Sequence, residues 1–159
     1  MKLENLSIPA AVMRKGMTLL DFFEECTRCR VPGLPYVDDQ GKIVGRISIR
    51  DVFKHIAIPE YVIKVAHVLG DRTENIELPE MKVRESLALP VEEFVLETIP
   101  NVSPQSGIVK ALAIMEMFNS SYVFLIENDK YLGIVTRMVI ARRMIEGVHT
   151  IEEDKCIVS

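Results

Sequence analysis

The feature that most constrains this chain of 159 residues is an internal repeat. The apolar face of an expected helix returns 89 residues later, and a glycine and a hydroxyl residue return 88 residues later. The repeated positions are Leu19, Phe22, Phe23, Cys26, Gly45 and Ser48, then Ile108, Ala111, Leu112, Met115, Gly133 and Thr136. The offset changes by one residue within a turn, where a deletion is tolerated. We therefore expect a tandem pair of similar units.

Each copy has the hydrophobic periodicity of a β-α-β-β-α unit. In the first copy we expect a short strand at 10–13, a helix at 17–29, strands at 34–37 and 42–47 around a polar turn, and a helix at 49–56. In the second copy we expect a strand at 99–102, a helix at 107–118, strands at 122–126 and 130–135, and a helix from Thr136 to about Glu146.

The connection between the copies is harder to interpret. Proline is common at the start of a helix and glycine at its end, so Pro59 and Gly70 predict a helix at 59–70. A polar loop is expected at 71–80. Short helices are expected at 81–87 and 91–96. The predicted organisation is a first unit at 1–57, a connection at 58–89, a second unit at 90–150 and a tail at 151–159, in the α+β class.

Composition excludes several functional classes. Hydrophobic residues make up 48% and charged residues 26% of the chain, which is typical of a globular protein. The net charge of −4 argues against a nucleic-acid partner, and no apolar run has the length of a membrane span. Three cysteines do not make a disulfide framework, so a cytoplasmic location is expected.

The most informative motif is Ser48-x-x-Asp51, which directly follows an expected strand. It fits a capping box, in which the hydroxyl and the carboxylate satisfy amides of the first helical turn. It also fits a ligand site, because helix N-terminal amides attract anions and a carboxylate accepts from two neighbouring hydroxyl groups. The sequence alone leaves both interpretations open.

The stretch from Gly33 to Asp51 resembles the cystathionine β-synthase (CBS) domain, which usually occurs as a tandem pair. The resemblance rests on Gly33-Leu-Pro-Tyr-Val-Asp and on Gly45-x-x-Ser48-x-x-Asp51. The second copy keeps Gly133 and Thr136 but has Val139 in place of the aspartate. The resemblance implies two units packed with pseudo-twofold symmetry, sheets flanked by helices, and a homodimer.

The resemblance also implies a role: binding of AMP, ADP, ATP or S-adenosylmethionine in clefts between the units, which regulates a partner protein. Asp51 would hold the ribose hydroxyls, with Ser48 near the ribose or phosphate. Arg50 either meets a phosphate or is a solvated surface charge. Positions implied on the adenine side have core packing as their alternative, the favoured one for Met13. The residues so assigned are Met13, Gly33, Pro35, Ile47, Ser48, Arg50 and Asp51, with Thr136 and Arg137 in the altered second copy.

Two cysteine patterns have weaker interpretations. Cys26-x-x-Cys29 falls near the end of a helix, not at the N-terminus that lowers a thiol pKa, and no second ligand pair suggests zinc. Core packing is therefore expected for Cys26. The last four residues, Cys156 to Ser159, match a prenylation box, but the residues before them are acidic.

No serine or cysteine has an evident histidine partner, and there is no phosphate-binding glycine loop or metal-ligand cluster. We therefore expect a regulatory nucleotide sensor and not an enzyme. The alternative is a ligand-free dimerisation or interaction module, in which Ser48 and Asp51 only cap a helix.

Overall fold

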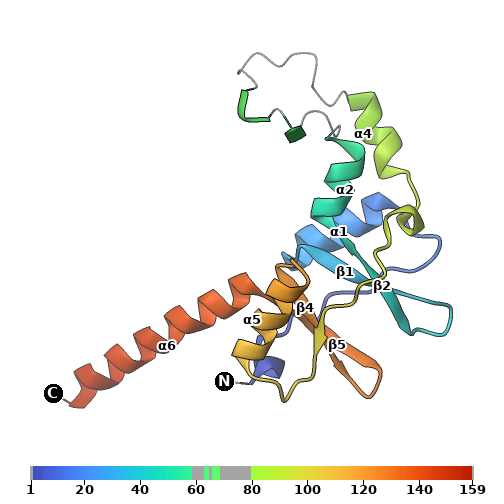
Figure 1. Cartoon of the computed structure of the whole chain (residues 1–159). Coiled ribbons are helices and arrows are strands. Elements are labelled where there is room, and N and C mark those ends of the chain that lie inside the picture. The colour runs from blue at the N-terminus through green and yellow to red at the C-terminus, as the bar shows by residue number, and fades with distance from the viewer. Residues whose placement is uncertain (1, 59–62, 65, 69–79, 159) are drawn as a thin grey trace. The chain divides into compact units, whose positions relative to one another are not determined.

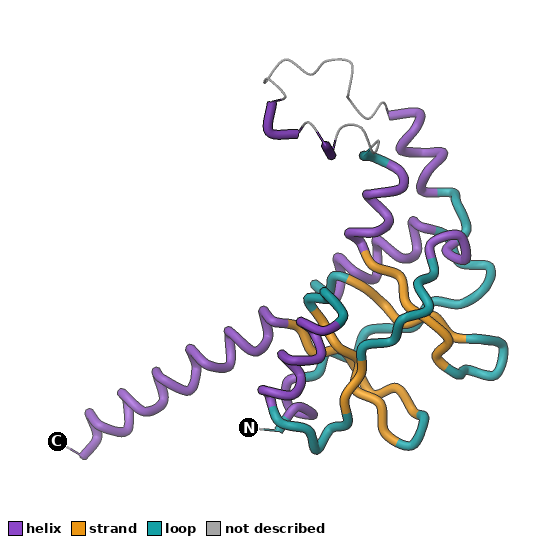
Figure 2. Tube along the Cα trace, viewed as in Figure 1, coloured by secondary structure: helices purple, strands orange, loops and turns teal. Residues whose placement is uncertain are grey.

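Two β-hairpins organise the computed structural model, which describes residues 2–58, 63–64, 66–68 and 80–158 (Figures 1 and 2). The first hairpin joins β1 (Gly33–Val37) to β2 (Ile43–Ser48), and the second joins β4 (Tyr122–Glu127) to β5 (Lys130–Thr136). Each contains a register shift at the equivalent place, at Tyr36/Val37 and at Leu125/Ile126. The repeat seen in the sequence is thus a repeat of structure.

The turns explain the one-residue change in offset. In the first hairpin, the Asp38 carboxylate accepts from the amides of Gln40 and Lys42 at 3.0 and 2.9 Å, and Gly41 has φ +81°. The second hairpin turns through Asn128 and Asp129, with φ of 51° and 61°, as a two-residue turn requires. The first turn is therefore the longer of the two.

Helices flank both hairpins. The helices and 3₁₀ turns are η1 (Leu3–Leu6), α1 (Leu19–Cys29), α2 (Ile49–Ile56), η2 (Ala66–Val68), α4 (Glu80–Leu87), η4 (Val91–Phe94), α5 (Ile108–Met117) and α6 (Arg137–Val158). The expected helices in the two repeats are all present, which confirms the α+β class. The expected helix at 59–70 and loop at 71–80 fall largely on residues outside the described ones.

Several predicted boundaries were wrong. The strand expected at 10–13 is a single bridge from Met13 to Tyr36, and the strand expected at 99–102 is only β3 (Asn101–Val102). Met13 and Val102 are equivalent positions in the two repeats. Each forms a short parallel pairing with the first strand of its own hairpin. The helix expected at 91–96 is the 3₁₀ turn η4. Helix α6 extends to Val158, well past the predicted end near Glu146.

The chain forms two compact units, and their boundaries do not follow the order of the sequence. One is Ala11–Glu97, here called the N-terminal repeat unit. The other, the C-terminal repeat unit, combines Met1–Ala10 with Thr98–Ser159. The predicted first unit at 1–57 therefore differs from the compact unit, because the first ten residues pack with the second repeat.

Each unit takes a single bridge residue, here called its borrowed edge strand, from the segment that precedes the other repeat. Ile8 pairs with Ile134: the Ile8 amide donates to Ile134 O at 2.8 Å, and Ile8 O accepts from the Ile134 amide at 2.9 Å. Leu96, 88 residues later, pairs in the same way with Arg46. Gly133 and Gly45 allow these close approaches, because a Cβ would meet Ile8 O at 2.9 Å and Leu96 O at 2.5 Å.

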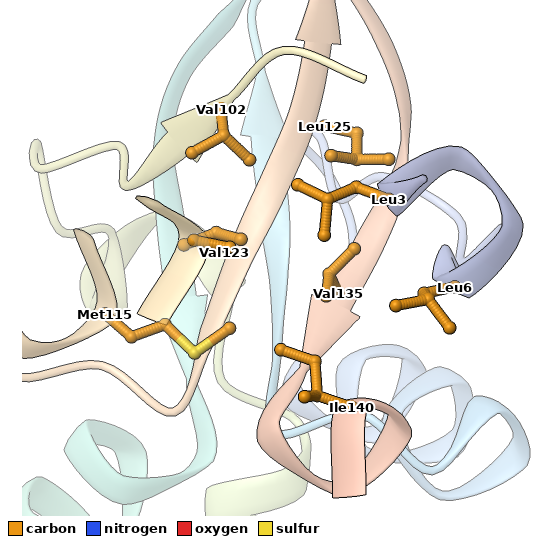
Figure 3. Packing of buried hydrophobic residues seen from close by; sticks show 9 residues of the cluster. Leu3, Leu6, Val102, Met115, Val123, Leu125, Val135 and Ile140 are labelled. Carbon is orange, nitrogen blue, oxygen red and sulfur yellow. The ribbon is translucent and has the colours of Figure 1, made fainter. Parts of the chain in front are cut away.

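The core of the C-terminal repeat unit shows what the borrowed segment contributes (Figure 3). Leu3 and Leu6 from η1 are buried against β5 and the first turns of α6. The buried cluster contains Leu3, Leu6, Val102, Ala111, Met115, Val123, Leu125, Val135 and Ile140. The first residues of the chain are thus structural parts of this unit.

Candidate functional site

The Ser48–Asp51 motif lies where β2 passes directly into α2. Ser48 pairs with Gly33 across the hairpin, and the Ile49 amide donates to Pro32 O at 2.9 Å. These contacts fix the strand-to-helix junction, with Ser48 only 5% exposed and Asp51 half-buried on the first turn of α2. The hairpin thus brings Gly33, Ser48 and Asp51 to one end of the N-terminal repeat unit.

A second copy of the same pattern tests the capping interpretation within this unit. Thr18-x-x-Asp21 closes a complete capping box at α1: the Thr18 amide donates to the Asp21 carboxylate at 2.9 Å, and the Asp21 amide donates to the Thr18 hydroxyl at 3.4 Å. Ser48 stands at the N-cap of α2, yet in the described structure its side chain makes no capping hydrogen bond. The pattern is therefore a cap at α1 but not at α2.

The register of β1 and β2 shows which residues lie on the same face of the first hairpin as Ser48. Gly33 pairs with Ser48, and Pro35 pairs with Arg46, so these four residues share one face of the hairpin. Arg46 is only 7% exposed. Sequence reasoning missed Arg46, although a basic residue within an apolar strand is a usable signal, because charged groups are rarely buried without a purpose. Arg46 and Ser48 are thus buried polar residues on the same face of this hairpin.

Other assigned residues lie deeper or further out. The Met13 amide donates to Pro35 O at 2.8 Å, and the side chains of Met13 and Ile47 are buried in the N-terminal repeat unit. Arg50 is exposed on the first turn of α2. Of the assigned residues in the N-terminal repeat unit, therefore, Arg50 and Asp51 have the more accessible side chains.

Thr136 and Arg137 belong to the C-terminal repeat unit, whereas the other assigned residues belong to the N-terminal repeat unit. The Thr136 hydroxyl accepts from the Val139 amide at 3.1 Å and so caps α6. Arg137 forms an ion pair with Glu116, and its amide donates to Ser121 O. Both residues thus have structural partners within their own unit.

Glu25, which directly precedes the Cys26-x-x-Cys29 pattern, is the centre of a polar cluster that includes Cys29. The Glu25 carboxylate accepts from the Arg28 guanidinium at 2.6 and 3.0 Å, from the Ala11 amide at 2.8 Å and from the Cys29 thiol at 3.2 Å. The Arg28 hydrogen bonds, ahead of the other donors, lower the Glu25 pKa to about 2. This carboxylate is a structural anchor between α1 and the segment that leads to Met13.

The two thiols have the opposite electrostatic character to a redox pair. Burial, reinforced by Glu25 and Cys29, raises the Cys26 pKa to about 12. Burial and the Glu25 hydrogen bond also raise the Cys29 pKa. Cys26 is 1% exposed, which confirms core packing. In the described part of the chain, no group of three or more His, Cys, Asp or Glu residues could hold a metal ion.

A surface hollow of about 420 Å³ lies at the C-terminal end of α2, away from Ser48. Its described lining is Lys54, Ile58, Ile63 and Lys64. Neither Ser48 nor Asp51 is among these described lining residues, so the hollow does not coincide with the Ser48–Asp51 junction. Among the described residues, no helix is both long enough and apolar enough to cross a bilayer.

Comparison with known proteins now places these features in a family. The CBS domain matches residues 7–58 and 91–146, more than half of the chain. The chain belongs to the CBS-domain family. Both matched regions correspond to the two repeats, and the second ends before the last twelve residues of α6. The chain is therefore a tandem CBS pair. No curated protein matches it.

Solved CBS structures share the fold at low identity. A CBS domain-containing protein of unknown function from Kribbella flavida is 20% identical, with a TM-score of 0.60 over 91% of this chain and 99% of that one. A similar protein from Bacillus anthracis is 18% identical, with a TM-score of 0.61 over 92% and 94%. The CBS domains of a transcriptional regulator from Streptococcus pneumoniae are 17% identical, with a TM-score of 0.58 over 89% and 98%.

Proposed function

We propose that this CBS pair is a regulatory sensor that binds an adenosine nucleotide, AMP, ADP or ATP, or S-adenosylmethionine, at the Ser48–Asp51 junction. The observation that carries the proposal is the contrast between two identical motif patterns. Thr18 and Asp21 satisfy each other and the helix N-terminus, whereas Ser48 forms no such cap within the described residues. The Asp51 carboxylate is therefore not committed to a capping box.

The chemistry of the junction suits a ribose phosphate. Asp51 has two acceptor oxygens, which match the two adjacent hydroxyl groups of a ribose. The first-turn amides of α2 and its dipole favour a phosphate, and Arg50 on the same turn adds a positive charge. Gly33 presents no side chain opposite Ser48, so a ligand can approach the backbone closely there.

The two repeats would contribute unequally. Val139 replaces the acid in the second copy and packs partly buried against the core of its unit, and Thr136 is used as a cap. We therefore expect one competent site in each chain. Ligand binding would favour one arrangement of the repeats over another and so change a surface recognised by a regulated partner, in a homodimer.

Calorimetric titration with AMP, ADP, ATP and S-adenosylmethionine tests the proposal, with a matched pair of variants. Asp51→Asn should weaken binding at least tenfold with little loss of stability, because one ribose acceptor is lost. Asp21→Asn alters the same pattern where it is a capping box. It should lower the free energy of unfolding by about 1 kcal/mol and leave the affinity unchanged.

No binding at millimolar ligand would reject the sensor function. Equal binding by wild type and Asp51→Asn would reject the site. The second candidate, a ligand-free interaction module, is favoured by the exposed apolar side chains of α5, since Val109 is 81% and Met117 69% exposed. A dimer whose thermal midpoint ignores all four ligands would support that alternative.

A further inference from the structure

The surface hollow at the C-terminal end of α2 has no part in the proposed nucleotide site. Its volume of about 420 Å³ falls within the range of small-molecule sites, and its described lining is Lys54, Ile58, Ile63 and Lys64. Ile63 and Lys64 belong to the connection between the two regions that match the CBS domain. The repeat alone therefore does not account for this hollow, because part of its wall comes from residues outside both matched regions.

The apolar part of the lining is open to solvent. Ile58 is 41% and Ile63 46% exposed, although isoleucine is among the residues most often buried. The two side chains line the same concavity and are not scattered singly over the surface. A ligand that covered them would remove apolar area from water, which is favourable. The hollow therefore suits a ligand with an apolar body.

The charged part of the lining is entirely basic among the described residues. Lys54 and Lys64 are both exposed, and the described structure gives neither of them an ion-pair partner. The next side chain, His55, is engaged on α2 itself, with Nδ1 2.9 Å from Asp51 O. Two ammonium groups at one concavity repel each other, and an anion beside both would offset that repulsion. The head of the ligand should therefore be negatively charged.

We propose that this hollow binds a small aliphatic anion, in which a carboxylate or phosphate head is joined to a hydrocarbon body. The two isoleucines would cover the body, and the two lysines would bind the head. Lysine acts as a point charge, so it accepts either head group. The inference does not depend on nucleotide binding, because Ser48 and Asp51 are absent from the described lining.

Titration of the full chain with octanoate, followed by calorimetry and by NMR of the backbone amides, tests the site. Wild type should bind octanoate at millimolar concentration or tighter, with amide shifts centred on Lys54, Ile58 and Lys64. Octyl phosphate should compete with octanoate, and the tighter of the two identifies the preferred head group. Acetate, inorganic phosphate and 1-hexanol each lack the charge or the hydrocarbon body, so each should bind about tenfold more weakly or not at all.

A matched pair of variants tests the lysines. Lys54→Gln/Lys64→Gln should weaken octanoate binding about tenfold, because it removes both charges and keeps long side chains. Lys42→Gln/Lys82→Gln is the control: it changes the net charge equally at two exposed lysines elsewhere in the N-terminal repeat unit. The control should bind octanoate like wild type. Higher ionic strength should weaken binding to wild type more than to Lys54→Gln/Lys64→Gln.

A second pair of substitutions tests the apolar wall. Ile58→Ser/Ile63→Ser should also weaken octanoate binding about tenfold, because less apolar area is covered by the hydrocarbon body. Both side chains are already exposed, so the thermal midpoint should change little. This variant should bind acetate no more weakly than wild type does, since it keeps both lysines.

The absence of octanoate binding would overturn the proposal. So would amide shifts centred outside the hollow, equal binding of 1-hexanol or acetate, or an equal loss of affinity in Lys42→Gln/Lys82→Gln. Asp51→Asn separates this proposal from the nucleotide site, because it should bind octanoate like wild type whether or not the sensor function holds.

Discussion

The two repeats place a hydroxyl residue at the same strand-to-helix junction and use it differently. The Thr136 hydroxyl accepts from the Val139 amide, and the residue three positions on is an apolar one that packs on the core. Ser48 makes no cap of this kind in the described structure, and the residue three positions on is an acid. One copy therefore caps its helix through the hydroxyl, whereas the other has an acid at this position, for which we propose a role in ligand binding.

The difference extends along the first helix of each repeat. Glu25 of α1 corresponds to Ile114 of α5, and Cys26 corresponds to Met115. The N-terminal repeat unit thus holds its entry segment by hydrogen bonds to a carboxylate, where the C-terminal repeat unit uses apolar packing. A stability contribution from Glu25 depends on pH, whereas one from Ile114 does not.

The closest backbone approaches in the two units should give the largest mutational effects. A Cβ at Gly45 would lie 2.5 Å from Leu96 O and 2.6 Å from Val95 Cγ1, and a Cβ at Gly133 would lie 2.9 Å from Ile8 O. Gly45→Ala should therefore lower the free energy of unfolding by about 3 kcal/mol and Gly133→Ala by about 2 kcal/mol. Chemical denaturation measures both.

Gly147→Ala is the control, because nothing lies within 4 Å of a Cβ there and alanine favours a helix. Equal stability of Gly45→Ala and wild type would contradict the borrowed edge strand at Leu96.

Substitution of Glu25 should have the next largest effect on the free energy of unfolding, and this effect should depend on pH. Its pKa falls from 4.5 to about 2 on folding, mainly through the Arg28 hydrogen bonds. A depressed pKa stabilises the fold above the unfolded value, and this contribution disappears as the pH falls from about 4.5 towards 2. Glu25→Gln should cost about 1–2 kcal/mol at pH 7, allowing for solvent screening.

Denaturation of wild type and Glu25→Gln at several pH values measures this contribution. The difference between them should narrow below pH 4.5, because the Glu25 carboxylate of the unfolded chain takes up a proton there while the native one stays ionised until the pH approaches 2. The exposed neighbour provides the control, since Glu24→Gln should have almost no effect at any pH. A gap that stays constant down to pH 2 would show that Glu25 acts through packing alone.

Local patterns predicted the repeat, the hairpins and the bounds of α2, because hydrophobic periodicity and turn residues specify them over a few positions. The borrowed edge strands at Ile8 and Leu96 were missed, since strand pairing over such separations leaves no local signal. The end of α6 was placed too early, near Glu146, although a single glycine such as Gly147 is tolerated inside a helix.

The candidate site was predictable in its residues but not in its use. Thr18-x-x-Asp21 and Ser48-x-x-Asp51 have the same pattern, and only the structure distinguishes the closed capping box from the other junction. Arg46 was missed although it is a basic residue within an apolar strand, because its position opposite Pro35 depends on the hairpin register. Pairwise geometry, not residue type, separates the junction with a closed capping box from the junction without one.

The smallest predicted effect on stability concerns the hydroxyl groups of Thr136 and Ser48, and it tests directly whether each of them caps its helix. Thr136→Ala removes the acceptor of the Val139 amide and should cost about 1 kcal/mol, whereas Thr136→Ser keeps the cap. Hydrogen exchange at the Val139 amide should accelerate in Thr136→Ala. In Ser48→Ala the equivalent amide, that of Asp51, should exchange at the wild-type rate, because the Ser48 side chain does not cap α2.

Faster exchange of the Asp51 amide in Ser48→Ala would mean that Ser48 caps its helix in solution. The two junctions would then be alike, and Asp51 would lose its main distinction from Asp21.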